Sequence, residues 1–153
     1  MHIRRKRLGE RGDTLVEVLV AIGIVSLVLG GAYVTTNKAL QATRDAQERT
    51  AGLKLVESQF EQLRSVTSSN PTSIFGASAP ATPYCMVNGA TASGGVCTMD
   101  ASGTSPGTGQ PKYTLGVSHP GGNVNTFAVT ETWPAVGGGT ETITMQYRLY
   151  QPQ

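Results

Sequence analysis

Basic side chains are nearly absent from the C-terminal part of this 153-residue chain, because residues 65–153 contain only Lys112 and Arg148. A nucleic-acid-binding surface needs lysines and arginines clustered on the folded body. This scarcity therefore argues against DNA or RNA as a direct partner. The formal net charge of +2 is also uneven, since five basic residues against Glu10 give residues 1–12 a charge of +4 and leave −2 for the rest.

Cysteine is scarce as well, and both copies, Cys85 and Cys97, lie in the C-terminal half. With no second cysteine pair and no histidine nearby, they do not match a zinc site. In an exported protein this pair would form a disulfide, which would stabilise the fold by roughly 2–3 kcal/mol in the chain-entropy model. In a cytosolic protein the two would be unpaired buried thiols.

The residues needed for catalysis or cofactor binding are not grouped. His119 is a lone histidine in a Pro-Gly-Gly turn, and Asp100, Glu131 and Glu141 are too scattered for a glycosidase pair or a calcium loop. The glycine-rich stretches lack the spacing of a phosphate-binding loop. We therefore predict no enzyme, no cofactor and no metal site.

Charge is missing altogether from residues 18–37. This run of about 20 residues would form ~30 Å of helix, which matches the hydrocarbon thickness of a bilayer. Because the basic residues precede it, the N-terminus is expected to stay in the cytoplasm while the remainder crosses the membrane.

Proline is absent from residues 37–67, which are rich in good helix formers. An apolar stripe of Leu53, Val56, Phe60 and Leu63 recurs at steps of three and four residues. We therefore predict one continuous helix over residues 13–67 that ends before the Asn70-Pro71 step and packs one side of its second half on the rest of the protein.

The periodicity changes to two after Pro111. Three alternating segments, at residues 112–118, 125–133 and 142–150, predict three strands of an antiparallel meander with one buried face each. Their expected buried residues are Tyr113, Leu115 and Val117, then Phe127, Val129, Glu131 and Trp133, then Ile143, Met145, Tyr147 and Leu149. Two further short strands are expected around Cys85 and Cys97. The fold class is thus α+β, a long N-terminal helix packed on a small antiparallel sheet.

Glu17 lies at the edge of the apolar run, where a carboxylate is energetically expensive. No lysine or arginine occurs in residues 12–37 to pair with it. Cleavage after Gly12 would create a cation, the α-amino group of Asp13, four residues from Glu17. The alternative is that Glu17 is a snorkelling acid at the end of an uncleaved membrane anchor.

The stretch "RGDTLVEVLVAI" resembles the signal of type IV prepilins and type II secretion pseudopilins, over about 25 residues. That signal is a short basic leader ending in Gly, followed by an apolar stretch with Thr at the second mature position and Glu at the fifth. Gly12, Thr14, Leu15 and Glu17 match it. Asp13 departs from it, because these families usually carry Phe or another apolar residue at the first mature position.

The resemblance implies a particular chemistry. A prepilin peptidase would cleave between Gly12 and Asp13 and methylate the new amine of Asp13. Glu17 would then attract the α-ammonium of a subunit already in a filament, with Thr14 also at the assembly surface. The carboxylate of Asp13 would weaken this attraction, which fits a minor subunit better than the main shaft.

We therefore expect a leader over residues 1–12, a helix over 13–67 that spans the cytoplasmic membrane at 14–36, and an extracytoplasmic head over 68–153. The expected function is that of a minor pilin in a type IV pilus-like filament. Other pilin subunits would be its partners through the helix, with an assembly ATPase and a platform protein involved indirectly.

Two alternatives remain at this point. The chain could be a pseudopilin of a type II secretion or DNA-uptake system. It could also be an uncleaved single-pass membrane protein that presents a small binding domain.

Overall fold

The computed structural model describes residues 13–75, 80–92, 95–108 and 112–151. It divides into two compact units, with the boundary inside the long helix between Thr43 and Arg44. The elements are α1 (Asp13–Ser69), η1 (Pro71–Ser73), β1 (Cys85–Val87), β2 (Ala90–Ala92), β3 (Cys97–Met99), β4 (Tyr113–Ser118), η3 (Pro120–Gly122), β5 (Thr126–Pro134) and β6 (Thr140–Arg148).

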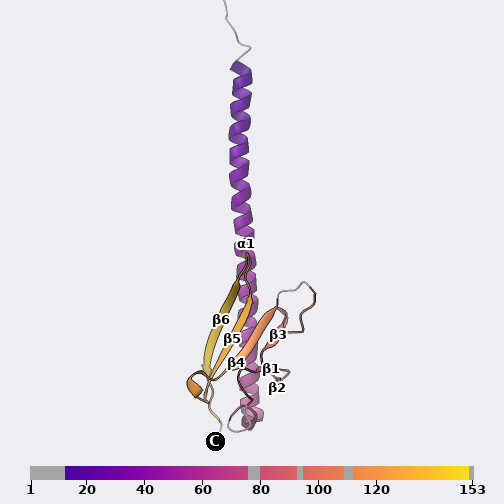
Figure 1. The fold of residues 1–153 in the computed structure, drawn as a ribbon, viewed down its shortest axis with the longest axis vertical. Coiled ribbons are helices and arrows are strands. Elements are labelled where there is room, and N and C mark those ends of the chain that lie inside the picture. The colour runs from indigo at the N-terminus through magenta and orange to yellow at the C-terminus, as the bar shows by residue number, and fades with distance from the viewer. Residues whose placement is uncertain (1–12, 76–79, 93–94, 109–111, 152–153) are drawn as a thin grey trace, which may run out of the picture. The chain divides into compact units, whose positions relative to one another are not determined.

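The second unit contains an antiparallel sheet with the strand order β3-β4-β5-β6 (Figure 1). Consecutive strands are neighbours, as the predicted meander requires, and β3 adds a fourth strand through the pairing of Cys97 with Leu115. Inward-facing side chains of β4 and β5 are buried, including Leu115, Phe127 and Val129, each 0 % exposed. The predicted α+β class, a long N-terminal apolar helix packed against an antiparallel sheet, is confirmed.

The prediction that β6 has one buried face is wrong. Met145 is 38 % exposed and Tyr147 is 48 % exposed, although Ile143 is half-buried. The physical reason is width: a helix about 10 Å across covers roughly two strands that are spaced about 4.8 Å apart. β6 is the edge strand (Figure 1), and the Phe60 ring of α1 lies 5.5 Å from the ring of Tyr147 on β6.

The buried face of α1 differs partly from the predicted stripe. Val56 and Leu63 are fully buried, but Leu53 is 36 % exposed. The helix turns about 100° per residue, and its buried side is centred near Gly52, so Leu53 is rotated about a quarter turn away. Additional buried positions on this side of α1, which the stripe omitted, are Leu55, Gln59, Val66 and Thr67.

The predicted strand around Cys85 is shorter than expected and forms a hairpin with β2, which was not predicted. Asn88 and Gly89 join the two strands with positive φ angles of 51° and 76°. An Asn-Gly pair with this conformation is the usual two-residue hairpin turn. The Asn88-Gly89 dipeptide was therefore the sequence signal from which β2 could have been predicted.

Candidate functional site

The first unit contains residues 13–43 of α1, in which large apolar side chains at positions 15–34 are exposed on every side of the helix. Leu15 is 64 % exposed and Leu27 is 79 % exposed, and the large apolar residues between them are exposed to a similar degree. Among the described residues, α1 is the one helix long and apolar enough, by length and composition, to cross a membrane. A helix that is hydrophobic all round requires lipid or other apolar helices around it.

The few hydroxyl groups in this unit are compatible with an apolar environment. Ser26 Oγ donates to the Ile22 carbonyl at 2.8 Å, and Thr35 Oγ1 donates to the Gly31 carbonyl at 2.9 Å. Hydroxyls that bond to the carbonyl four residues earlier need no water. The glycines nearby would accept a side chain, since nothing lies within 4 Å of a Cβ built on Gly30.

The predicted assembly residues lie at the start of α1. The helix begins at Asp13, and Glu17 follows four residues later on the same continuous helix. Thr14 and Glu17 are both exposed. Gly12, the predicted residue before the cleavage site, lies outside the described residues.

In the second unit, a buried glutamine joins α1 to the β1–β2 hairpin. Gln59 is 2 % exposed, its Nε2 donates to the Met86 carbonyl at 2.9 Å, and its Oε1 accepts from the Met86 N–H at 2.9 Å. Gln62 accepts from the Gly89 N–H at 3.2 Å one turn later. The two amides therefore pair with backbone groups of the hairpin that β2 does not reach, and they fix the hairpin against the helix.

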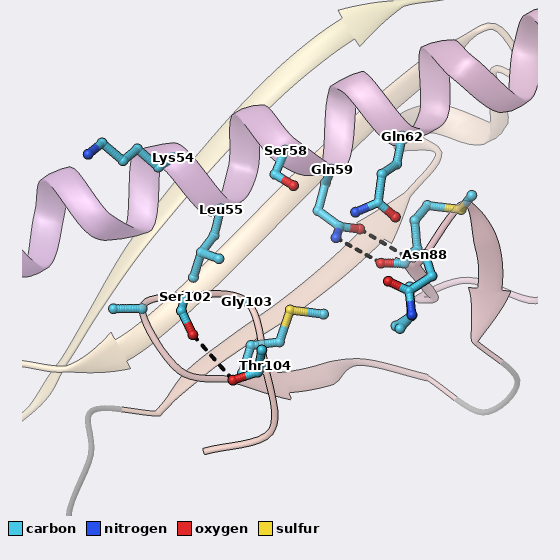
Figure 2. A pocket seen from close by; sticks show the side chains of 13 residues that line it. Lys54, Leu55, Ser58, Gln59, Gln62, Asn88, Ser102, Gly103 and Thr104 are labelled. Atoms are coloured by element: carbon cyan, nitrogen blue, oxygen red, sulfur yellow. Dashed lines mark hydrogen bonds between the residues drawn. The ribbon is translucent and has the colours of Figure 1, made fainter. Parts of the chain in front are cut away.

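A groove of about 390 Å³ lies beside this contact, between α1 and the loops that follow β1 and β3. Figure 2 shows Leu55 of α1 facing the loop that carries Ser102, Gly103 and Thr104, and Gln59 directed toward the β1–β2 hairpin beside Asn88. Of the described residues that line it, none is a histidine or a carboxylic acid. The groove therefore offers hydroxyl and amide groups and the amine of Lys54, but no carboxylate or imidazole among the described residues.

The loop below the groove is organised by Asp100. Its Oδ1 accepts from the Ser102 N–H, the Ser102 hydroxyl and the Thr104 N–H, and its Oδ2 accepts from the Thr104 hydroxyl at 2.8 Å. These hydrogen bonds, that of the Ser102 hydroxyl above all, hold the pKa of Asp100 well below its usual range. All the donors come from the carboxylate's own loop, which indicates a structural role for Asp100.

The most unusual group in the second unit is the carboxylate of Glu131 on β5. Glu131 is 0 % exposed, and within the described part of the chain neither of its oxygens has a hydrogen-bond partner. A Cβ built on Gly52 of α1 would lie 3.3 Å from both oxygens. Burial raises the pKa of Glu131 to about 7. A glycine at position 52 thus leaves the space that the carboxylate occupies.

Two further titratable groups belong to this region. The Tyr113 hydroxyl on β4 reaches the Glu48 carbonyl at 3.5 Å, and burial, Glu48 and Glu131 together raise the pKa of Tyr113. The pKa of Glu48 is raised by burial and by the neighbouring acids Asp45 and Glu141, against the opposite effect of Arg44. The interface between α1 and the sheet is therefore rich in carboxylates around Glu48 and Glu131.

The predicted disulfide between Cys85 and Cys97 is present and ties β1 to β3, with the two Cα atoms 5.9 Å apart. That separation is typical of disulfides in proteins. Within the described residues, no group of three or more His, Cys, Asp or Glu side chains is arranged to hold a metal ion.

The sequence reasoning missed the roles of Gln59 and Glu131. Both carried a signal, because Gln59 lies on the helix face of Val56 and Leu63, and Glu131 alternates with Phe127, Val129 and Trp133 on β5. When periodicity places a polar residue inside the core, that residue should be checked for a buried hydrogen bond or an unpaired polar group.

An exposed apolar helix segment that continues into a small disulfide-tied α+β head is a pilin-like arrangement. The comparison with protein families agrees, because the prokaryotic N-terminal methylation motif matches residues 7–33. The match is confined to this N-terminal segment, which therefore resembles the N-terminal segment of prepilin-type proteins, and the motif implies processing by prepilin peptidase. No curated protein and no solved structure was found to match the chain.

Proposed function

We propose that this protein is a minor pilin of a type IV pilus-like filament. It is held in the cytoplasmic membrane with its N-terminus inside, is cleaved between Gly12 and Asp13, and is methylated at the new amine of Asp13. The observation that carries the proposal is the continuity between the methylation motif at residues 7–33 and a helix whose apolar side chains are exposed on every side.

The energetics of assembly rest on Glu17. In an apolar bundle of helices its carboxylate needs a cation, and the segment itself offers none. The α-ammonium of Asp13 on a neighbouring subunit supplies one. Removing one partner of a buried ion pair costs about 3–5 kcal/mol, which is enough to select against subunits that are wrongly placed or unprocessed.

The second unit has the features of an extracytoplasmic head. Its disulfide between Cys85 and Cys97 fits an oxidising compartment. Residues 65–153 carry little charge, so the head is a weakly charged surface that the filament would present outward. An assembly ATPase and a platform protein would act on the helix from the membrane.

The minor role follows from Asp13. Its carboxylate lies beside the new amine and competes with Glu17 for the positive charge. A subunit with a weakened pair is suited to initiation or to the filament tip. Recovery of this protein as the dominant subunit of sheared filaments would contradict the minor role without affecting the assembly mechanism.

A pseudopilin of a secretion or DNA-uptake system is the second candidate, because the same N-terminal chemistry serves both. Its distinguishing observation would be a loss of secretion or of DNA uptake in a deletion strain that still makes long surface fibres.

Glu17→Gln tests the proposal, because it keeps the size of the side chain and removes only its charge. We expect at least a 10-fold decrease of the protein in sheared filaments relative to the membrane fraction, since the lost pair is worth several kcal/mol. Glu57→Gln, an exposed change later in α1, is the control and should assemble like the wild type. Equal incorporation of the Glu17→Gln protein would refute the proposed role of the pair.

A further inference from the structure

We propose that Glu131 is a proton-controlled switch in the interface between α1 and the sheet: the protonated side chain lets β5 pack closely on Gly52, and the ionised side chain drives them apart. This switch lies in the head and is independent of the assembly pair at Glu17.

The first argument is the environment of the carboxyl group. Glu131 is 0 % exposed, and both of its oxygens lack hydrogen-bond partners among the described residues. An ionised carboxylate in such a place is strongly unfavourable unless it is paired, and the usual response is to take up a proton.

The second argument is the geometry of the contact. Glu131 lies on β5 between Leu115 of β4 and Ile143 of β6, so apolar residues flank it within the sheet. On the helix side, its two oxygens approach the position that a Gly52 Cβ would fill to 3.3 Å. There is therefore no space for water between the carboxyl group and the helix unless α1 moves.

The third argument is the charge on the surrounding elements. The titratable groups in this region come from three elements. α1 contributes Glu48 and, further out, Asp45 and Arg44. β4 contributes Tyr113, and β6 contributes Glu141. Three of these groups are carboxylic acids, and the positive charge of Arg44 lowers the pKa of Glu48. Ionisation of Glu131 would thus add a negative charge to a region that is already acidic.

The direction of the pH dependence follows from linkage. In the folded protein Glu131 holds this proton up to a pKa of about 7, whereas an ordinary Glu side chain has a pKa of 4.5. The stabilising effect of the bound proton is complete below pH 4.5 and is lost as the pH rises through 7. The equilibrium constant for unfolding should therefore rise about 30-fold between about pH 5.5 and pH 8.5.

The test is urea unfolding of the full chain in a non-ionic detergent, monitored by tryptophan fluorescence. The single tryptophan, Trp133, lies two residues from Glu131. The wild type should show the 30-fold change between these pH values. Glu131→Gln should remove most of the change, whereas Glu61→Gln, on the exposed side of α1, should retain it. A flat wild-type profile, or a change that survives in Glu131→Gln, would overturn the proposal.

A second measurement avoids the variant and so does not depend on its folding. The carboxyl carbon of Glu131 in the wild-type protein can be titrated by NMR. A midpoint near pH 7 supports the switch, and a midpoint near 4.5, the ordinary value for Glu, contradicts it.

Discussion

Gln59 shows how one side chain connects the helix to the part of the head that lacks regular partners. The hairpin of β1 and β2 is short, and three residues of each strand pair with one another. A two-stranded ribbon of this size is not stable alone. The bidentate bond between Gln59 and Met86 supplies an anchor in a place where water is excluded.

Replacement of Gln59 by Ala should therefore destabilise the head by about 2–3 kcal/mol, because the Met86 N–H and carbonyl would be buried without partners. Gln62→Ala is the matched control. It removes one longer bond at an exposed site and should cost less than about 1 kcal/mol. Urea unfolding monitored by Trp133 fluorescence would measure both, and equal effects of the two variants would contradict the anchoring role.

Single residues were the hardest part of the site to predict. The motif of Gly12, Thr14 and Glu17 is local, so the sequence alone reveals it. The environment of Glu131 depends instead on Gly52, which is 79 positions away in the chain, and on the register of three strands. Periodicity placed Glu131 on the buried face, but it could not indicate that the carboxyl group would find no partner there.

The elements were predictable where their patterns were long. The helix over Asp13–Ser69 and the strands β4, β5 and β6 follow from apolar periodicity and from the absence of proline. The burial of β6 was not predictable from its alternation, because it depends on how much of the sheet one helix covers. The hairpin strand β2 was missed because it is three residues long and carries only alanines and a threonine.

The disulfide is the covalent link between two of these short elements. A double variant Cys85→Ala with Cys97→Ala should lose about 2–3 kcal/mol of head stability, since the closed loop of the unfolded chain is released. Urea unfolding of the wild type refolded under reducing conditions should give the same midpoint as the double variant. A midpoint unchanged from that of the oxidised wild type would show that the link is energetically irrelevant.

The whole molecule combines two units with different requirements. Residues 13–43 of α1 expose apolar side chains on all sides and need a bilayer or a bundle of helices. The unit from Arg44 onward has its own core, in which Val56, Leu63, Phe127 and Trp133 are buried. In the proposed function, the first unit would account for storage and assembly, and the second for what the filament presents.

The predicted division into a leader over residues 1–12, a helix over 13–67 and a head over 68–153 stays a prediction. The compact units indicate that the second half of α1 is structurally part of the head, since Val56 and Leu63 contribute to its core. The head should consequently not fold without residues from about 44 onward, so a fragment that begins at residue 68 would lack one side of its core.

The mass of the N-terminal peptide of the protein recovered from membranes tests the central claim most directly. In the proposed function, cleavage between Gly12 and Asp13 would create the cation for Glu17, and every later step of assembly would depend on it. The account predicts a mature chain that begins at Asp13 with a methylated amine. A chain that still begins at Met1 and carries the leader would contradict it and would favour the uncleaved membrane anchor.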